Sequence, residues 1–286
     1  MSKQKRVAAI HDISGLGKCS LTVALPILSA AGIETCVLPT AILSTHTGGF
    51  TDFTYRDLTE DILPFAKHWK SLDIEFDAMY SGFLGSFQQL SIVSEIFDIF
   101  QRKENLILVD PVMADNGMLY QTFTPDFVDG MAKLCKKADL IVPNITEAAF
   151  LLGESYQPGP YTRTYIESLI KKLSSLGPKQ VVLTGVYFDD KKLGAATYDK
   201  NTDTISYSFS QKFDGVFHGT GDIFASVLLS AVLNGFELSK AAQLAVKVVT
   251  QSILRTRAAG TDLRFGVNFE NSIPYMINEL GLLNKY

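Results

Sequence analysis

The beginning of the chain restricts the possible fold more than any other feature. A continuous apolar run, Val7–Ile10, lies within residues 6–13, which is typical of a strand buried on both faces. Apolar residues then recur at helical spacing over 21–28, and a second strand is expected at 35–38. A strand, a helix and a strand in this order predict two parallel strands joined by a right-handed crossover.

The same alternation of strands and helices continues along the chain. However, two hairpin-like strands are also expected, with polar turns at 189–192 and 199–203. Ile205, Tyr207 and Phe209 alternate as in a half-exposed strand. The sequence therefore predicts an α/β fold with a mostly parallel central sheet and an antiparallel edge. The further parallel strands are expected at 77–80, 106–109, 140–142 and 180–185.

Composition and charge exclude several classes of protein. The 286 residues are 47% hydrophobic and 20% charged, as in a globular chain long enough for one large domain or two small ones. A net charge of −4 gives no indication of binding to nucleic acid or to an anionic membrane. The three cysteines fit neither a disulfide framework nor a zinc site, so we expect a cytoplasmic protein. No apolar run approaches the roughly 18 residues of a membrane span, and the N-terminal one is too short for a signal peptide.

The segment with the clearest chemistry is Gly219-Thr220-Gly221-Asp222. An apolar helical pattern follows it directly, so the segment forms the first turn of a predicted helix. Backbone N–H groups at a helix N-terminus attract an anion, and glycines let the anion approach closely. A neighbouring carboxylate could take the proton of an attacking alcohol, which suits phosphoryl transfer. The alternative is that Asp222 only caps the helix and the glycines only form a turn.

Several polar turns, this segment included, follow predicted strands or begin predicted helices. In a mostly parallel sheet such turns open on one edge, where α/β proteins bind their ligands. One site could therefore contain an anion hole, a base, two or three acids and a flexible cover. The cover would be the polar, glycine-bearing segment 41–56, which could also be a plain surface loop. These turns are 14–20, 44–52, 81–86, 110–117, 143–147, 184–185 and 218–222.

The turn after the first strand does not match either common phosphate loop. A P-loop requires Ser or Thr after Gly-Lys, but Cys19 stands there, and Asp12 replaces the first glycine. A dinucleotide fingerprint starting at Gly15 lacks its acidic residue, because Glu34 precedes the second strand instead of ending it.

Two acidic positions allow both a structural and a functional interpretation. Asp110 follows a strand that Pro111 ends, so it is either a turn residue or a group facing the ligand edge. Asn144 and Glu147 have the spacing of a capping box at a helix start. The same two side chains could hold a hydrated magnesium ion at the carboxyl edge of the sheet.

Together these motifs resemble the ribokinase-like superfamily and, within it, the vitamin B6 kinases for pyridoxal, pyridoxine and pyridoxamine, most closely the bacterial pyridoxamine kinases. The resemblance covers nearly the whole chain. It implies a three-layer α/β/α sandwich in a single domain, residues 1–286, with a cover loop near 44–56. It also implies ATP-dependent transfer of phosphate to the 5′-hydroxymethyl group of a B6 vitamer, with Mg²⁺ as cofactor. The segments that carry it are 14–15, 46–48, 81–83, 110–113, 143–147, 184–185 and 219–222.

The resemblance also implies a role for each matching residue. Asp222 would be the catalytic base, kept ionised at neutral pH by helix N–H groups and a nearby cation. The N–H groups of Gly219, Thr220 and Gly221 would stabilise the migrating phosphate. The substrate ring would be met by Ser14, Gly15, His46, Thr47 and Phe83. ATP would be met by Asp110, Asn144, Thr184, Gly185, Phe213, Val216 and His218, and the metal by Glu147 and Asp110.

Two positions bear on cofactor and substrate. Val142 occupies a position where several B6 kinases carry a threonine that helps to hold a monovalent cation, so potassium dependence is in doubt. Asp222 stands where hydroxymethylpyrimidine kinases often carry cysteine, which favours a B6 vitamer. A hydroxymethylpyrimidine or sugar kinase, an NAD-binding dehydrogenase and a non-catalytic vitamer carrier remain alternatives. We expect a homodimer whose ligands are ATP and a small molecule.

Overall fold

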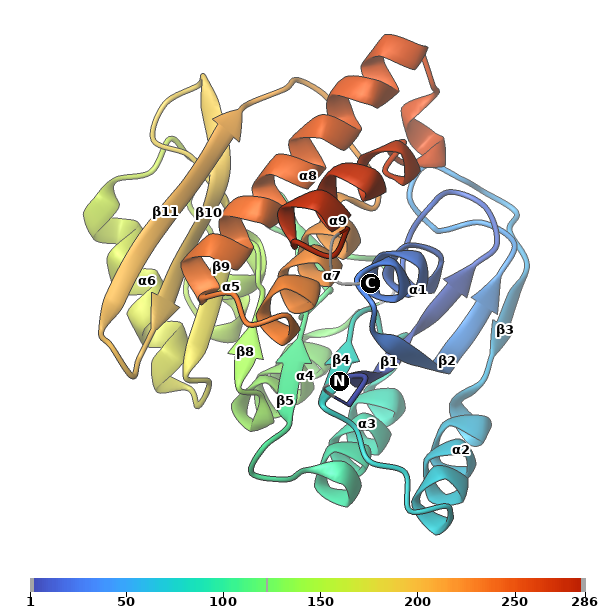
Figure 1. Ribbon diagram of the computed structural model, residues 1–286. Helices are drawn as coiled ribbons and strands as arrows, with labels where there is room; N and C mark the ends of the chain where they lie inside the picture. Colours follow the sequence, from blue (N-terminus) through green and yellow to red (C-terminus); the bar gives the residue numbers. More distant parts are fainter. Residues whose placement is uncertain (1–2, 122, 284–286) are drawn as a thin grey trace. The chain divides into compact units, whose positions relative to one another are not determined.

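The computed structural model describes residues 3–121 and 123–283 (Figure 1). The chain divides into two compact units. The first contains the described residues up to Asp77 together with those from Phe213 onward, and the second spans Ala78–Lys212. The single kinase domain expected from the resemblance stays a prediction.

The first unit contains the predicted strand–helix–strand opening. Strand β1 (Arg6–Ser14) pairs in parallel with β2 (Glu34–Leu43). Helix α1 (Leu21–Ala30) connects the two strands and packs against both. Residues 7–10 of β1 are fully buried, as their continuous apolar pattern predicts.

Strand β2 is longer than the sequence predicts. It continues past Pro39, which lies opposite His11 of β1, and ends only at Leu43. A short antiparallel strand, β3 (Tyr55–Asp57), then pairs with residues 41–43. The expected loop over 41–56 is therefore confined to residues 44–54. Its base is closed by Ser44 and Thr54, because each N–H donates to an oxygen of the other residue, at 3.1 Å and 2.9 Å.

A strongly apolar helix packs against two other helices of the first unit. Helix α7 (Thr220–Leu233) begins where predicted and packs against both α1 and α8 (Leu238–Ala259), as Figure 1 shows. Every residue from Ile223 to Ala231 is buried, so α7 has no solvent-facing side over this stretch. Helices α2 (Thr59–Ser71) and α9 (Ile273–Glu279) complete this unit, with short 3₁₀ turns at Leu263–Phe265 and Glu270–Ser272.

The second unit contains the rest of the parallel strands and the predicted antiparallel edge (Figure 1). Its strands run in the order β11-β10-β9-β8-β5-β4, and the last four of these are mutually parallel. The hairpin β10–β11 pairs antiparallel with β9, which confirms the predicted edge. The bounds are β4 (Ala78–Ser81), β5 (Leu106–Val109), β8 (Leu140–Ile141), β9 (Gln180–Val186), β10 (Lys192–Asp199) and β11 (Thr204–Gln211).

Four helices connect these strands, and one predicted loop contains a hairpin. The helices are α3 (Phe87–Phe100), α4 (Pro125–Lys137), α5 (Ile145–Leu151) and α6 (Arg163–Ser175). Strands β6 (Ala114–Asp115) and β7 (Met118–Leu119) pair where the sequence suggests a loop. Asn116 and Gly117 both have positive φ, 51° and 80°, as the tight turn of such a hairpin requires.

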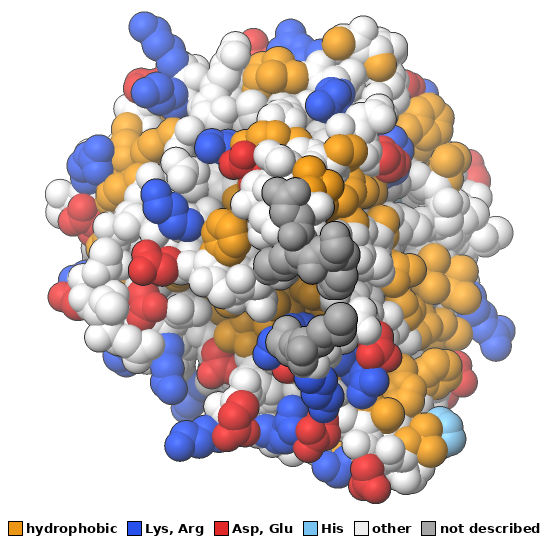
Figure 2. Space-filling view, in the orientation of Figure 1, with side chains coloured by type: hydrophobic (Ala, Val, Ile, Leu, Met, Phe, Trp, Pro, Cys, Tyr) orange, Lys and Arg blue, Asp and Glu red, His pale blue; other side chains and the backbone are white. Residues whose placement is uncertain are grey.

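The surface carries charges of both signs. Figure 2 shows lysine, arginine and carboxylate side chains interspersed with apolar ones over the visible face. Among the residues that the structure describes, no helix combines the length and the apolar character needed to cross a membrane.

The buried environment of α7 leads to a stability prediction. Leu228 is fully buried in α7, whereas Leu254 of α8 is about half exposed. We expect Leu228→Ala to lower the free energy of unfolding by about 2–5 kcal/mol, because it leaves a cavity. The matched control Leu254→Ala should cost much less. Urea unfolding of both variants measures the difference, and equal losses would contradict the packing described for α7.

Candidate active site

The N-terminus of α7 has the geometry of an anion site. Gly219 is the N-cap with φ of 77°, and no side chain caps the helix. The hydroxyl of Thr220 donates to the carbonyl of Phe217 at 2.9 Å, so it closes the preceding turn. A Cβ at Gly221 would meet no other atom within 4 Å. Open space therefore lies beside Gly221 in the first turn of this 14-residue helix, whose dipole favours negative charge at its N-terminus.

Asp222 lies in the first turn of α7, but its ionisation differs from the expectation. The side chain keeps some surface exposure, yet the surrounding protein displaces most of its water, and this desolvation raises the pKa of Asp222 to about 7. A hydrogen bond from the Ser20 N–H opposes the rise, and the charge of Asp12 adds to it. The carboxyl group is therefore not fully ionised at neutral pH. A pKa near 7 suits a group that exchanges protons at that pH.

The turn between β1 and α1 packs directly on this helix start. The Lys18 carbonyl lies so close to Gly219 that a Cβ at residue 219 would collide with it. On another side, a Cβ at Gly266 would lie 2.5 Å from the Gly17 carbonyl. Lys18 itself adopts φ of 54°, in the left-handed region that is unfavourable for a side-chain-bearing residue. Glycine is thus required at 219, where φ is positive and backbone approaches backbone.

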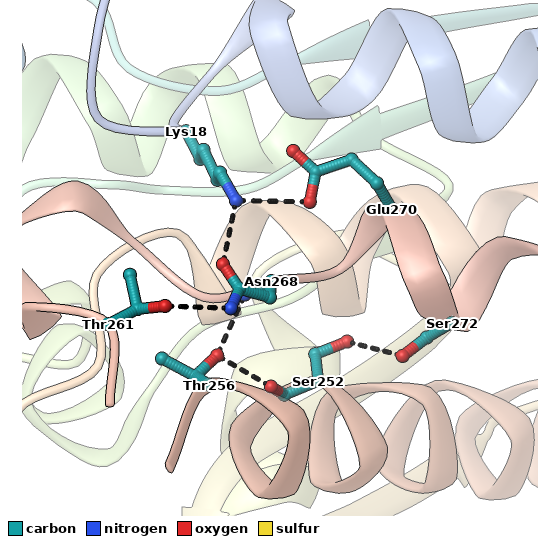
Figure 3. A network of polar contacts seen from close by, with 7 residues as sticks. All are labelled: Lys18, Ser252, Thr256, Thr261, Asn268, Glu270 and Ser272. Atoms are coloured by element: carbon teal, nitrogen blue, oxygen red, sulfur yellow. Dashed lines mark hydrogen bonds and ion pairs between the residues drawn. The ribbon is translucent and has the colours of Figure 1, made fainter. Parts of the chain in front are cut away.

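A polar network anchors this turn to the C-terminal part of the first unit (Figure 3). The Lys18 ammonium donates to Asn268 at 2.9 Å and forms an ion pair with Glu270 at 3.1 Å. The Asn268 side chain donates to Thr261, and its backbone N–H donates to Thr256 of α8. The network therefore holds Lys18, and with it the carbonyl that touches Gly219, against residues 256–270.

The cover segment is attached through His46. The Gly48 N–H donates to Nδ1 of His46 at 3.1 Å, so the ring carries its hydrogen on Nε2. That Nε2–H donates to the Arg264 carbonyl at 2.7 Å. The ring also lies 4.8 Å from that of His218, which directly precedes Gly219. Burial lowers the pKa of both histidines, and the charge of His218 lowers that of His46 further.

The other predicted site residues of the first unit differ in their exposure and in their contacts. Ser14 is buried and its hydroxyl donates to Asp12 at 2.9 Å, while the Gly15 N–H donates to the carbonyl of Leu43. Thr47 is exposed in the cover segment and Val216 is 64% exposed. The Phe213 ring lies beneath the Arg257 guanidinium of α8, at 5.6 Å.

In the second unit, Asn144 and Glu147 form the capping box that their spacing predicts. The Asn144 side chain accepts from the Glu147 N–H at 2.9 Å, and the Glu147 carboxylate accepts from the Asn144 N–H at 2.9 Å. The other Glu147 oxygen accepts from the Met113 N–H at 3.1 Å. Burial raises the pKa of Glu147 despite these bonds. A capping carboxylate can also accept from metal-bound water, so the capping box is compatible with the predicted metal role.

The carboxylates of this unit fit a metal only through water and phosphate. Over residues 3–121 and 123–283, no cluster of three or more His, Cys, Asp or Glu side chains is arranged to hold an ion directly. Asp110 is buried, and its N–H donates to the Ser81 carbonyl. Magnesium commonly binds one or two carboxylates, several waters and substrate phosphates. Asp110 and Glu147 fit that kind of site and not a site built from protein ligands alone.

The remaining predicted residues of the second unit lie near its strand ends. Both the N–H and the hydroxyl of Thr184 donate to the Pro143 carbonyl, and Gly185 has φ of 75°. Phe83 packs against Phe123 with ring centres 5.6 Å apart, so it belongs to an aromatic cluster.

Sequence reasoning missed the residues that surround Asp222. From the sequence, Asp12 is only the residue in place of the first P-loop glycine, and Ser20 is only the last residue of the polar turn 14–20. The sequence does contain an indication for Asp12, because a charged residue near the end of a buried strand needs a partner or a function. No local pattern indicates the role of Asn268, since that role depends on its contact with Lys18, which is far away in the sequence.

Comparisons with known proteins agree with the observed fold. The family described as phosphomethylpyrimidine kinase matches residues 25–265. A Bacteroides thetaiotaomicron protein crystallised with pyridoxal is 37% identical, with a TM-score of 0.92 over 96% of each chain. The pyridoxal kinase of Lactobacillus plantarum is 30% identical, with a TM-score of 0.89 over 100% of each chain. The Dictyostelium discoideum pyridoxal kinase is 28% identical, over 65% of this chain and 64% of that protein. The predicted fold class is thereby confirmed.

The histidine environment predicts a specific pH dependence. Because the folded-state pKa of His46 is lowered, the neutral ring is favoured, and folding stability falls as the pH drops below the ordinary value of about 6.5. Protonation would also remove the acceptor for the Gly48 N–H. Between pH 7 and pH 5, we expect the free energy of unfolding to fall less in His46→Gln than in the parent chain. The control is His68→Gln, at an exposed position of α2. Urea unfolding at both pH values decides, and an unchanged pH dependence in His46→Gln would contradict the prediction.

Proposed function

The chain belongs to the family of pyridoxal and phosphomethylpyrimidine kinases and is a phosphotransferase, and we propose that it phosphorylates the 5′-hydroxymethyl group of a B6 vitamer with ATP. The observation that carries this proposal is the start of α7. There, an uncapped helix N-terminus adjoins a carboxyl group whose pKa is raised to about 7. The Bacteroides relative crystallised with pyridoxal supports the choice of substrate.

The proposed reaction uses both features of the α7 start. The vitamer hydroxyl loses its proton to Asp222 while its oxygen forms a bond to the γ-phosphorus, and the bond from that phosphorus to the β-phosphate oxygen breaks to release ADP. The N–H groups of Gly219, Thr220 and Gly221 stabilise the charge on the migrating phosphoryl group. Since only the ionised carboxylate accepts a proton, turnover rises with pH through the region near 7.

The ring of the vitamer is bound, on this proposal, by Ser14, Gly15, His46, Thr47 and Phe83. Ser14 commits its hydroxyl hydrogen to Asp12, so its oxygen offers a lone pair to the ring. A protonated pyridine nitrogen is the matching donor. The cover segment 44–54 excludes water, which would otherwise compete as phosphate acceptor.

The nucleotide, on this proposal, is bound through its phosphates, its adenine ring and its magnesium ion. Thr184 and Gly185 meet its phosphates, while Phe213, Val216 and His218 lie on the adenine side. Asp110, Asn144 and Glu147 hold Mg²⁺ through water, and the ion supplies neutralisation of phosphate charge. With Val142 in the position of a cation-binding threonine, we expect little dependence on potassium. The homodimer expected from the resemblance is checked by light scattering.

A second candidate is phosphorylation of hydroxymethylpyrimidine, which the description of the matching family favours. The discriminating experiment is a magnesium-ATP assay with pyridoxal, pyridoxine, pyridoxamine and hydroxymethylpyrimidine side by side. We expect phosphate on at least one B6 vitamer and a lower kcat/KM for the pyrimidine. Turnover of the pyrimidine alone would reject the B6 assignment and keep the reaction class. No turnover of any of the four would reject both substrates.

Removing the base tests the role of Asp222. We expect Asp222→Asn to keep vitamer binding and to lose about a hundredfold or more in kcat, since general-base catalysis contributes on that order. Asp61→Asn, at an exposed position of α2, is the matched control. Calorimetry measures binding and coupled ADP release measures turnover. Unchanged turnover in Asp222→Asn would mean that another group accepts the proton.

A further inference from the structure

The two halves of the turn between β1 and α1 are anchored in different ways. In the first half, the N–H groups of Gly15 and Leu16 donate to the carbonyls of residues 43–44 at the end of β2, at 2.8 Å and 3.1 Å. The second half contains Lys18, whose carbonyl contacts the start of α7 at Gly219. Contacts other than those to β2 therefore have to hold this second half against α7.

Lys18 has a backbone conformation that its residue type does not favour. Its φ of 54° lies in the left-handed region. Glycines allow the close packing around it, because a Cβ at Gly219 would collide with the Lys18 carbonyl, and one at Gly266 would lie 2.9 Å from the Lys18 Cβ. An unfavourable conformation of this kind persists only where the surrounding structure enforces it. The side chain of Lys18 is one source of that constraint.

The Lys18 side chain binds the segment that follows α8 (Figure 3). Its ammonium donates to the Asn268 side-chain oxygen at 2.9 Å and pairs with Glu270 at 3.1 Å. The Glu270 side chain is 51% exposed, and ion pairs in contact with water contribute little. The bond to Asn268 is partly buried. Asn268 is therefore the partner that fixes the position of the ammonium.

Asn268 is in turn fixed by α8 and by the end of that helix. Its side-chain nitrogen donates to the Thr261 hydroxyl at 2.9 Å, and its backbone N–H donates to the Thr256 hydroxyl at 2.7 Å. Thr256 is fully buried and donates its own hydrogen to the Ser252 carbonyl. Because an ammonium group can only donate, the Asn268 amide has to direct its oxygen at Lys18. The orientation of the amide is thus set on both sides.

We propose that Lys18 and Asn268 are positioning residues for the anion site: their hydrogen bond holds the Lys18 carbonyl against Gly219, and this contact fixes the first-turn N–H groups of α7 for phosphoryl transfer. The inference rests on the proposed function in so far as these N–H groups stabilise the migrating phosphoryl group. Donors that are held in place before the reaction stabilise developing charge best, and a small displacement of them costs rate.

The main variant is Asn268→Ala, which releases the Lys18 ammonium and leaves its charge in place. With the preferred B6 vitamer of the assay panel, we expect kcat to fall about tenfold or more, because the α7 donors lose their fixed position. KM for the vitamer should change little, since Ser14 and Gly15 belong to the half of the turn that is tied to β2. Coupled ADP release measures both constants.

Two variants separate positioning from a direct effect of charge. In Asn268→Asp, the carboxylate can accept from Lys18 and from the Thr261 hydroxyl, so kcat should return close to that of the parent chain. Lys18→Met should lower kcat as Asn268→Ala does. If Lys18→Met lowers kcat while Asn268→Ala does not, the lysine acts on the phosphate through its charge, and the proposal is overturned.

Loss of stability alone is excluded by a control and by the conditions. Lys5→Met removes another ion pair of the same unit, with Asp77 at 3.0 Å, and should leave kcat unchanged. All assays are made where urea unfolding shows each variant to be fully folded, so a merely structural role would leave kcat unchanged. If Asn268→Ala does not fold, Thr261→Val replaces it. This variant removes only the bond that orients the amide, and a smaller fall in kcat is expected.

A spectroscopic measurement separates this proposal from the proposed function. In the ligand-free chain labelled with ¹⁵N-glycine, the Gly221 amide signal is identified by its loss in Gly221→Ala, a position with free space for a Cβ. Asn268→Ala should shift this signal, whereas Lys5→Met should not. An unmoved signal, or an unchanged kcat, in Asn268→Ala would overturn the proposal. If the parent chain phosphorylates none of the panel, the proposed function fails, and the Gly221 signal still decides whether Asn268 positions the start of α7.

Discussion

The candidate site depends on one close approach of two backbone segments, the Lys18 carbonyl against Gly219. The contact requires a glycine, because a side chain at 219 would occupy the position of the carbonyl oxygen. It brings the turn after β1 to the first turn of α7, although the two lie far apart in the sequence. Asp222 gains its neighbours Ser20 and Cys19 through this contact, and the desolvation that raises its pKa follows from the same packing.

Different hydrogen bonds hold the candidate site residues of the two units in place. In the first unit, side chains of α8 and the segment after it hold the turn around Lys18 (Figure 3). In the second unit, the pair Asn144–Glu147 is held by bonds within its own helix start and to the backbone of Met113. The acidic group of the second unit is therefore placed by backbone N–H groups, whereas the turn of the first unit is held mainly through side chains.

The sequence predicted most elements because their apolar periodicity is local. The strand–helix–strand opening, the helix after Asp222 and the β10–β11 edge all followed from patterns within a few residues. Strand β3 was not predicted because its three exposed residues show no alternation, and the predicted second strand ends at residue 38, directly before Pro39, whereas β2 continues past it. In the candidate site, the position of Asp222 was predictable but its raised pKa was not. That shift arises from burial and from Asp12, which only the tertiary structure brings close.

The short ladder between β2 and β3 has a consequence for the loop that it closes. Residues 41–43 pair with 55–57, and Ser44 and Thr54 bond to each other at the loop base. The ends of the loop are thus already brought together before any ligand arrives. The entropic cost of joining its ends is met during folding, so ordering the loop over a bound molecule costs only the local freedom of its own residues. If the loop closes over the substrate as proposed, it therefore loses less binding free energy to ordering than a loop with free ends would.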